Sequence, residues 1–480
     1  MNSKSINEIT TLAIDTSCDE TSCSIVRGTT VLSSVMPSQQ KYHEKYGGVV
    51  PSLAKLAHTE RIDNVVVEAL KRAIPHSASN DAAASDRPSP LPGEGETQES
   101  DLRKYMSEVD LVAVTYGPGL AIALEVGVRK AIALAEKFDK PLMIINHMEG
   151  HLLSGFVERN SKVKIKHDKE HGQITHPPFR DLPSREGKAV LGFLISGGHT
   201  EMIKVNGIGD YEKIGVTLDD SCGEYYDKAG RMLGLGYPAG PTVSRFADDQ
   251  RKKFKIEIKK NNKSTNVIGT NKESGTSYSL PIPMYRSGDF NFSFSGLKTA
   301  FKELTNSLVK DEITIEDQLN KETKNLSGDQ INDLCVMIEA SAITQLKVKL
   351  ERAIKKHNPS ELWLGGGVIA SKRLRSEFRS LCKKNDVKLK YPYSSKLTGD
   401  NAAMIGVAAN IKLGVAGGEL RVAGIELGRE TGNGVNKMGS LFDYLRENKD
   451  KAESLGVLFN NFDRVDRDPN AEIDEEIVLD

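Results

Sequence analysis

The chain has 480 residues, of which 38% are hydrophobic and 27% charged, and its formal net charge is −1. This composition is typical of a globular protein long enough for two or three domains. The balanced charge excludes a global field that would attract nucleic acid or a membrane, but it allows a local basic patch. Five dispersed cysteines form no CxxC pair, which favours a reducing compartment.

The N-terminal sequence MNSKSINEITTLAI has neither the apolar core of a signal peptide nor the arginine-rich pattern of a transit peptide. The longest apolar stretch, residues 120–138, is interrupted by charged side chains, which predicts a water-exposed helix and no membrane span. We therefore expect a cytoplasmic protein.

Two segments share one pattern of an apolar strand, a polar turn and a second strand. TLAIDTSCDETSCSIV opens the chain, and AVLGFLISGGHTEMIKV covers Ala189–Val205. Each segment predicts a β-hairpin. Because strands and long helices follow each copy, we expect an α/β protein with two related lobes around a central cleft.

The expected domains follow from these repeats and from shifts in composition. The first lobe covers 1–157, with a disordered insertion at about 75–108 that is rich in Ser, Pro, Gly and acidic residues. A charged insertion covers 158–188, and the second lobe covers 189–415. The C-terminal segment, 416–480, is expected to return to the first lobe and to end in an acidic tail.

Two charged segments have alternative interpretations. The basic insertion at about 251–277 contains RKKFKIEIKKNNK, which either touches phosphates or forms an exposed charged loop, and the loop is the favoured interpretation. Three histidines of the charged insertion, His167, His171 and His176, are expected to be solvated rather than to bind metal.

A histidine pair lies in IINHMEGHLLSGF, with His147 and His151 four residues apart. On a helix this spacing places both rings on one face, where they can share a metal ion. Each helical residue advances about 100°, so Glu149 points to the opposite side. In the HExxH protease motif the glutamate instead follows the first histidine directly. The pattern predicts a metal site without a protease base; ordinary core or surface histidines are the alternative.

Several glycine-rich or acidic turns are candidates for binding phosphate. SGGHT at Ser196–Thr200 lets backbone N–H groups approach an anion, and GGGV at Gly365–Val368 precedes a helix. The second motif matches neither the Walker nor the Rossmann pattern. The turn IDTSCDET at Ile14–Thr21 is rich in acids and hydroxyls. Glu224 and Asp227 share one helix face, and their spacing alone leaves binding and simple exposure equally open.

Asp400 lies in LTGDNAAM, immediately before an apolar helix. Its favoured role on this basis is to cap the helix, which stabilises it by about 1 kcal/mol. A site with two histidines needs a third ligand, and the sequence offers several acidic residues with no spacing rule that selects one.

In their order along the chain, these motifs resemble the tRNA threonylcarbamoyladenosine transferase family, once called O-sialoglycoprotein endopeptidases, and in particular its bacterial and organellar branch. The similarity spans about Leu12 to Arg429 outside the insertions. The segments that carry it are DTSCDETS (Asp15–Ser22), YGGVVPSLA (Tyr46–Ala54), GPGLAIALEVG (Gly117–Gly127), HMEGHLLS (His147–Ser154), ISGGHTEMI (Ile195–Ile203), DDSCGEYYDKAGRMLGLGYPAGP (Asp219–Pro241), FSFSGLKTA (Phe292–Ala300), GGGVIAS (Gly365–Ser371) and GDNAAMI (Gly399–Ile405).

The resemblance implies an actin/Hsp70-like (ASKHA) fold with a duplicated mixed β-sheet. It also implies transfer of a threonylcarbamoyl group from threonylcarbamoyl-AMP to the exocyclic amine of the adenosine 3′ of the anticodon, in tRNAs that read ANN codons. The implied metal ligands are His147, His151 and Asp400, for one divalent ion, iron or zinc. Glu20 and Asp19 are the implied catalytic candidates near the reacting centre. The implied substrate-binding residues are Leu194, Ile195, Ser196, Gly197, Gly198, Asp227, Gly240 and Ser371.

Three positions depart from the family pattern: Ser52 replaces a glutamate, Ala239 a glycine and Ser371 an asparagine. Serine loses reach and one donor–acceptor pair relative to asparagine, which puts the nucleotide contact of Ser371 in question. The implied partners are tRNA and either a paralogous non-catalytic subunit with a small ATPase, as in bacteria, or a second copy of the chain. An actin-like ATPase or small-molecule kinase is the alternative function, and a scaffold that has lost catalysis also fits the change at Ser371.

Overall fold

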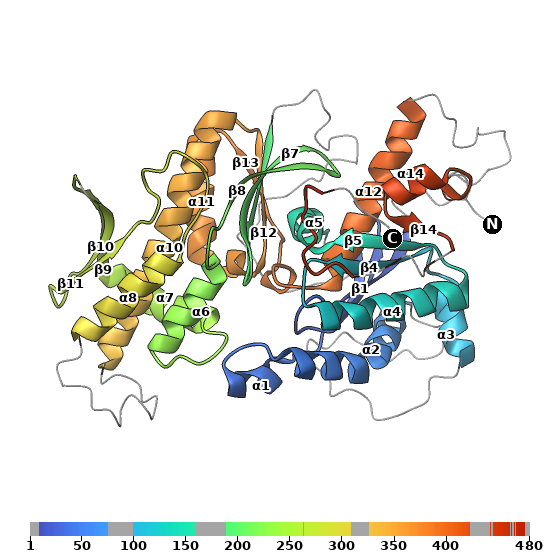
Figure 1. The fold of residues 1–480 in the computed structure, drawn as a ribbon, viewed down its shortest axis with the longest axis horizontal. Helices are drawn as coiled ribbons and strands as arrows, with labels where there is room; N and C mark the ends of the chain where they lie inside the picture. Colours follow the sequence, from blue (N-terminus) through green and yellow to red (C-terminus); the bar gives the residue numbers. More distant parts are fainter. Residues whose placement is uncertain are drawn as a thin grey trace.

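The computed structural model describes residues 9–74, 99–158, 189–262, 264–308, 326–422, 442, 445–460, 462, 465 and 467–475. Two α/β lobes lie side by side in this part of the chain (Figure 1). Within these ranges no helix is long and apolar enough to cross a membrane.

Each lobe is built on a mixed β-sheet. The first sheet has the order β14 (Val457–Leu458), β5 (Leu142–Asn146), β4 (Leu111–Gly117), β1 (Thr10–Asp15), β2 (Ser22–Arg27) and β3 (Thr30–Val35). The second has the order β13 (Lys388–Lys390), β12 (Glu361–Gly365), β6 (Val190–Ile195), β7 (Thr200–Gly207) and β8 (Asp210–Val216).

The two sheets repeat one arrangement. Strand β1 is antiparallel to β2 and parallel to β4, and β6 is likewise antiparallel to β7 and parallel to β12. Every residue of β1 and of β6 is buried, as expected for strands covered on both faces. Both predicted hairpins and the two-lobed, duplicated α/β fold of the actin/Hsp70 type are therefore confirmed.

Helices cover both faces of the first sheet. Leu12 and Ile14 pack into one core with α2 (Pro51–Ala73) and α4 (Ala121–Phe138), whereas Ala13 packs into another with α12 (Ala402–Val422). This alternation follows from the two-residue period of a strand. Short helices α1 (Gln40–His43), α3 (Glu99–Met106) and α14 (Lys449–Ser454) complete this lobe.

Among the described residues, the second lobe has five longer helices, and α5 lies between the lobes. The five are α6 (Cys222–Met232), α7 (Gly240–Gln250), α8 (Ser295–Leu308), α10 (Gly328–His357) and α11 (Lys372–Lys384). Helix α5 (His147–Leu153) follows β5 of the first sheet and contacts β6 and β12 of the second, as well as α12. Every residue of α5 is buried, so the histidine pair is enclosed by both lobes.

The chain returns to the first lobe earlier than the predicted boundary at residue 416. Helix α12 begins at Ala402 and packs against β1 and β2. Its residues from 402 to 414 are all buried, because it lies between the first sheet and α5. Further along, β14 pairs antiparallel with β5 of the same sheet. The remaining domain boundaries stay predictions.

Two predicted insertions contain regular structure. In the segment predicted to be disordered, 75–108, residues 99–106 form α3, while 75–98 lie outside the described residues. Within 251–277, the expected charged loop is instead β9 (Phe254–Lys260) and β10 (Thr265–Asn271), which form a three-stranded sheet with β11 (Ser277–Pro281). The three histidines of 158–188 lie outside the described residues.

Candidate metal and nucleotide site

The histidine pair lies on one face of α5, as its spacing predicts. The side chain of Asn146 caps this helix by accepting hydrogen bonds from the backbone N–H groups of Met148 (2.9 Å) and Glu149 (3.3 Å). The rings of His147 and His151 have centroids 4.6 Å apart, and both residues are buried. The strand-to-helix turn therefore presents two imidazoles together.

Asp400 completes a cluster of three groups that could ligate a metal. Its Oδ1 atom lies 3.1 Å from Nε2 of His151 and 3.4 Å from Nε2 of His147. One ligand atom from each residue lies within 4.8 Å of the others. The cap of α12 is instead Asn401, which accepts from the N–H of Met404 at 3.1 Å. The predicted capping role of Asp400 is therefore wrong, and its carboxylate is directed at the histidines.

The charges of the cluster fit a cation. Burial opposes an imidazolium, yet the carboxylates of Asp400 and Asp15 raise the pKa of His147 to about 10. Burial likewise opposes the charge of Asp400, but the two histidines hold its pKa well below its usual range. A metal ion displaces protons from the side chains that bind it. The proton that His147 retains beside these carboxylates therefore marks a position that a metal ion can occupy. Asp15 Oδ1 lies 3.6 Å from Nδ1 of His147, which is too long for a hydrogen bond but close enough for electrostatic attraction.

Glu149 points away from the cluster, as the helical wheel predicts. Its carboxylate accepts hydrogen bonds from the hydroxyl of Tyr211 and from Nζ of Lys412, both at 2.9 Å. Glu149 and Lys412 form a buried ion pair between α5 and α12. The glutamate is thus a structural link between the elements on which the ligands lie, and it cannot activate a water at the cluster.

The acidic turn between β1 and β2 carries the catalytic candidates Asp19 and Glu20. Partial burial, followed by the charges of Asp19 and Asp400, raises the pKa of Glu20. His58 on α2 holds the turn in place. Its Nδ1 atom lies 2.8 Å from the hydroxyl of Thr21, and its Nε2 atom lies 3.1 Å from the carbonyl of Cys18.

A cavity of about 530 Å³ lies in the second lobe. Four of the residues predicted to bind substrate line it: Gly197, Asp227, Gly240 and Ser371. The other predicted residues have different positions. Leu194 and Ile195 are buried at the end of β6, and Ser196 and Gly198 lie in the turn that follows.

Three helices begin at this cavity. The first turns of α6 and α7 contribute Gly223 and Gly240, and Ser371 is the N-cap of α11. Helix N-termini carry partial positive charge, which favours an anion such as a phosphate, although Asp227, Asp248 and Asp249 also line this cavity. A Cβ at Gly223 would lie 2.6 Å from the carbonyl of Ser196, so only glycine lets α6 approach the SGGHT turn this closely.

The triple glycine links the helix of the histidine pair to the cavity. A Cβ at Gly365 would lie 2.3 Å from the carbonyl of His151, and a Cβ at Gly366 would lie 2.4 Å from the carbonyl of Ile195. The backbone of Gly366 has φ of +98°, which side-chain-bearing residues rarely adopt. Gly367 then lines the cavity. These glycines bring β12 close to both α5 and β6, and so hold the two features next to each other.

Asp227 and Ser371 both cap helices at the cavity. Asp227 Oδ1 accepts from the N–H groups of Ala239 (2.8 Å) and Gly240 (3.1 Å), and burial raises its pKa. Ser371 accepts from the N–H of Leu374 at 3.3 Å and donates to the buried carboxylate of Glu339 at 3.4 Å. The hydroxyl of Ser371 is therefore already engaged within the protein.

Sequence reasoning missed two cationic residues of the cavity, Arg245 on α7 and Lys372 at the start of α11. Neither belongs to a glycine-rich or acidic motif. Each lies within five residues of the start of a helix that the structure shows.

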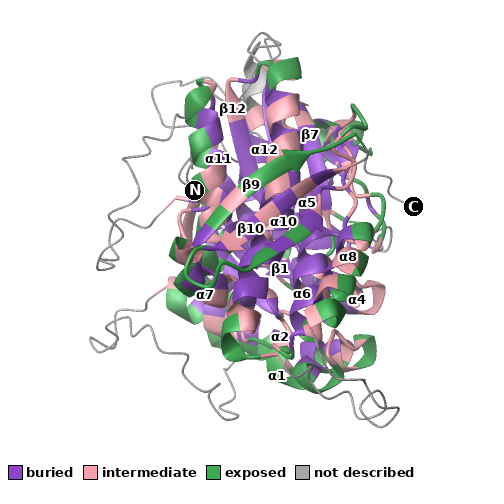
Figure 2. Cartoon of the chain, turned by 90° about the vertical axis from the view of Figure 1, so that its left-hand side faces the viewer, coloured by how far each residue is buried: buried purple, intermediate pink, exposed green. Residues whose placement is uncertain are grey.

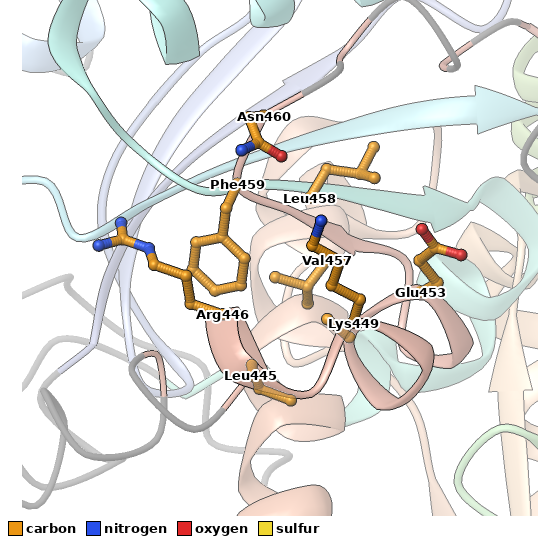
Figure 3. Close-up of a pocket in the computed structure, with 9 residues that line it drawn as sticks. Leu445, Arg446, Lys449, Glu453, Val457, Leu458, Phe459 and Asn460 are labelled. Carbon is orange, nitrogen blue, oxygen red and sulfur yellow. The ribbon is translucent and has the colours of Figure 1, made fainter.

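A second, smaller hollow of about 110 Å³ lies in the C-terminal segment (Figure 3). Its walls come from α14 and β14, and the guanidinium carbon of Arg446 lies 5.1 Å from the ring centroid of Phe459. It contains none of the predicted site residues.

Comparison with known proteins agrees with the motifs. The model of the TsaD family, tRNA N6-adenosine threonylcarbamoyltransferase, matches residues 30–84, 98–174 and 182–407. A curated relative with that name from Trichlorobacter lovleyi is 35% identical over 403 residues, covering 84% of this chain and 91% of the relative. One from Staphylococcus aureus (strain JH9) is 33% identical over 404 residues, covering 84% and 91%.

Among solved structures, full-length HypF in its phosphate- and nucleotide-bound form aligns with 85% of this chain and 47% of its own. The identity is 9% and the TM-score 0.40, which is too low to support an argument about the site. The sequence matches, in contrast, extend through both lobes and include the histidine pair. The chain therefore belongs to the tRNA N6-adenosine threonylcarbamoyltransferase family.

Proposed function

We propose that this protein transfers the threonylcarbamoyl group from threonylcarbamoyl-AMP to the exocyclic amine of the adenosine 3′ of the anticodon, in tRNAs that read ANN codons. The observation that carries the proposal is that one backbone segment adjoins two chemically different features. Gly365 packs against the backbone of His151, which belongs to a His/His/Asp cluster suited to a cation, and Gly367 lines a cavity suited to a phosphate. A mixed anhydride of a carbamate and AMP presents both kinds of group to one site.

The AMP portion of the donor is proposed to occupy the cavity. The N-termini of α6, α7 and α11 oppose the charge of its phosphate, with Arg245 and Lys372 nearby. Leu194, Ile195 and Ser196 hold the turn that carries Gly197 and Gly198. The amides of these two glycines are proposed to stabilise the negative charge that develops on the carbonyl oxygen during transfer.

His147, His151 and Asp400 are proposed to hold one divalent ion. The set of two imidazoles and a carboxylate suits iron or zinc. Bound there, the ion would supply Lewis-acid polarisation and would help to orient the threonylcarbamoyl end of the donor. The residues of the cluster thus fix this end relative to the phosphate in the cavity.

The accepting amine is a weak nucleophile, so its orientation against the donor carbonyl must contribute much of the rate. Glu20, with Asp19 beside it, is proposed to take the proton that the amine loses as the new C–N bond forms and AMP leaves. The raised pKa of Glu20 makes its carboxylate a stronger base. Positive charge bound at the cluster would lower this pKa towards the working pH.

The partners follow from the family. The acceptor is tRNA, and we propose that the chain acts in the cytoplasm. It acts there either with a paralogous non-catalytic subunit and a small ATPase or as a pair of identical chains.

The test is a reconstituted transfer assay. The purified protein is incubated with tRNA, labelled threonine, bicarbonate, ATP, the adenylate-forming synthase and each proposed partner set, and tRNA nucleosides are analysed by mass spectrometry. We expect threonylcarbamoyladenosine with the wild-type chain and none with Asp400→Ala. If the complete mixture yields no modified adenosine while the chain alone hydrolyses ATP, the actin-like ATPase or kinase function is correct instead.

A further inference from the structure

The small sheet of the second lobe has an outward face of distinctive composition. Strand pairing places three rows of residues on it: Lys255, Thr270 and Ser277; Glu257, Ile268 and Ser279; Lys259, Asn266 and Pro281. We call these nine residues the lysine face. All are exposed or half-buried, and β9 lies across the front of the molecule in Figure 2.

The lysine face rests on a rigid support. The alternate residues Phe254, Val267 and Leu280 are buried and belong to the core that includes α10. Asp333 of α10 is buried and accepts hydrogen bonds from the side chains of Asn271, Tyr278 and Gln250. The segment is therefore a fixed platform that presents its outward side chains at defined spacing.

Positive charge predominates on and around this face. Lys252, Lys260 and Lys272 are exposed at its borders, in addition to Lys255 and Lys259 on the face itself. The acids are fewer: Glu257 pairs with Lys255 at 2.9 Å, and Glu273 pairs with Lys253 at 2.8 Å. The chain as a whole has a net charge of −1, so this local excess of lysine is not a general property of the surface.

We propose that the lysine face binds the phosphate backbone of tRNA outside the anticodon loop, an inference that rests on the proposed function. Helix α7 begins at the cavity and leads through 251–253 directly into β9. Its 11 residues extend about 16 Å, so the face lies beyond the cavity at a distance that an RNA stem can cover. The ammonium groups of lysine and the hydroxyl and amide side chains on β10 and β11 are typical donors to phosphate oxygens.

Lysines on β9 have another possible use, since β9 is an edge strand and lysine on an edge discourages pairing between molecules. Removing the charges of these lysines would have a different effect in each case. Loss of phosphate contacts weakens tRNA binding in a salt-dependent way, whereas loss of edge protection causes self-association.

The test variant is Lys255→Gln with Lys259→Gln, which removes charge but keeps polar side chains. With full-length tRNA we expect the KM for tRNA to rise roughly fivefold at physiological salt, with kcat unchanged. The slope of log KM against log salt should become shallower by about 1.5, because each lost contact contributes about 0.7–0.9. Lys71→Gln with Lys104→Gln, on α2 and α3 of the other lobe, removes the same charge and should leave both values unchanged.

A short anticodon stem-loop separates this inference from the proposed function. Wild type and variant should modify it equally, because it is too short to reach the lysine face. An unchanged KM and salt slope with full-length tRNA would overturn the inference, and self-association of the variant would then identify edge protection. If no substrate is modified by either protein, the proposed function fails. In that case equilibrium binding of fluorescent tRNA still tests whether the lysine face binds tRNA. A higher Kd in the variant than in wild type would support it, and an equal Kd would overturn it.

Discussion

The two ends of the candidate site are built in different ways. At the metal cluster, three buried or half-buried side chains meet, and Asp400 lies 249 residues after His151 in the chain. At the cavity, the groups available to a ligand are mostly helix N-termini and glycine backbone around about 530 Å³. The ligand preference of the cluster therefore depends on the chemical identity of its side chains, whereas that of the cavity depends on backbone geometry.

The resemblance to the family implies two substitutions near the candidate site, and both concern the cavity end. Ser371 lines the cavity, and Ala239 directly precedes Gly240, which lines it. Ala239 donates its backbone N–H to Asp227 and has φ of −83°, so a methyl group in place of hydrogen does not alter its role. Ser371 still caps α11 through its hydroxyl. The three residues of the cluster show no such change from the implied ligand set.

The strongest test of the contrast removes one ligand of the cluster. We expect His151→Ala to lower the transfer rate by roughly a hundredfold or more, since loss even of groups that support a metal ligand costs about 10–100-fold. The measurement is kcat/KM for the donor together with metal content. A normal rate in a correctly folded variant would contradict the role of the cluster.

Breaking the ion pair behind the cluster should have the next largest effect. In Glu149→Gln, the ammonium group of Lys412 stays buried without its counter-charge, which costs about 3 kcal/mol of unfolding free energy. Because the pair links α5 and α12, metal affinity should fall as well. Chemical denaturation and metal titration measure the two effects, and Tyr211→Phe, which keeps the charge pair, is the control. Equal metal affinity in Glu149→Gln and wild type would show that the pair does not position the ligands.

At the cavity, the two roles of Asp227 can be separated by two substitutions. Asp227→Ala should lose about 1 kcal/mol of stability through the lost cap of α7, whereas Asp227→Asn should keep it because an amide oxygen can accept the same N–H groups. If Asp227 also contacts the donor, Asp227→Asn still raises the donor KM. A donor KM equal to that of wild type in Asp227→Asn would leave only the capping role.

The smallest effect on stability and donor binding is expected at Ser371. Ser371→Asn restores the family residue, and since asparagine caps helices as well as serine does, stability should change by less than about 0.5 kcal/mol. We expect the donor KM to fall two- to threefold because the amide reaches further into the cavity. A rise in KM would mean that the cavity is adapted to serine.

Much of the fold follows from the sequence because the relevant signals are periodic. The two hairpins repeat an apolar strand and polar turn, and the helical wheel correctly separates Glu149 from the histidine pair. The strand β9 also had a signal, because apolar and charged residues alternate in Lys255–Lys259 as they do along a strand. The excess of lysine there led to the wrong expectation of a loop.

Other features had no local signal. Asp400 precedes a helix in the manner of a cap, and only tertiary structure shows that Asn401 takes that role. The apolar sequence of α12 predicts burial but not which sheet it covers, so the lobe boundary was misplaced. Arg245 and Lys372 reach the cavity because three helices converge there, which no spacing in the sequence reveals.

We propose that His147, His151 and Asp400 hold the ion on which transfer depends. The most direct measurement is elemental analysis of the purified chain and of Asp400→Ala, each paired with the transfer assay. We expect one divalent ion per wild-type chain and neither ion nor transfer in Asp400→Ala, while the circular dichroism spectra of the two proteins are the same. A metal-free wild-type chain that transfers threonylcarbamoyl groups at full rate would contradict it.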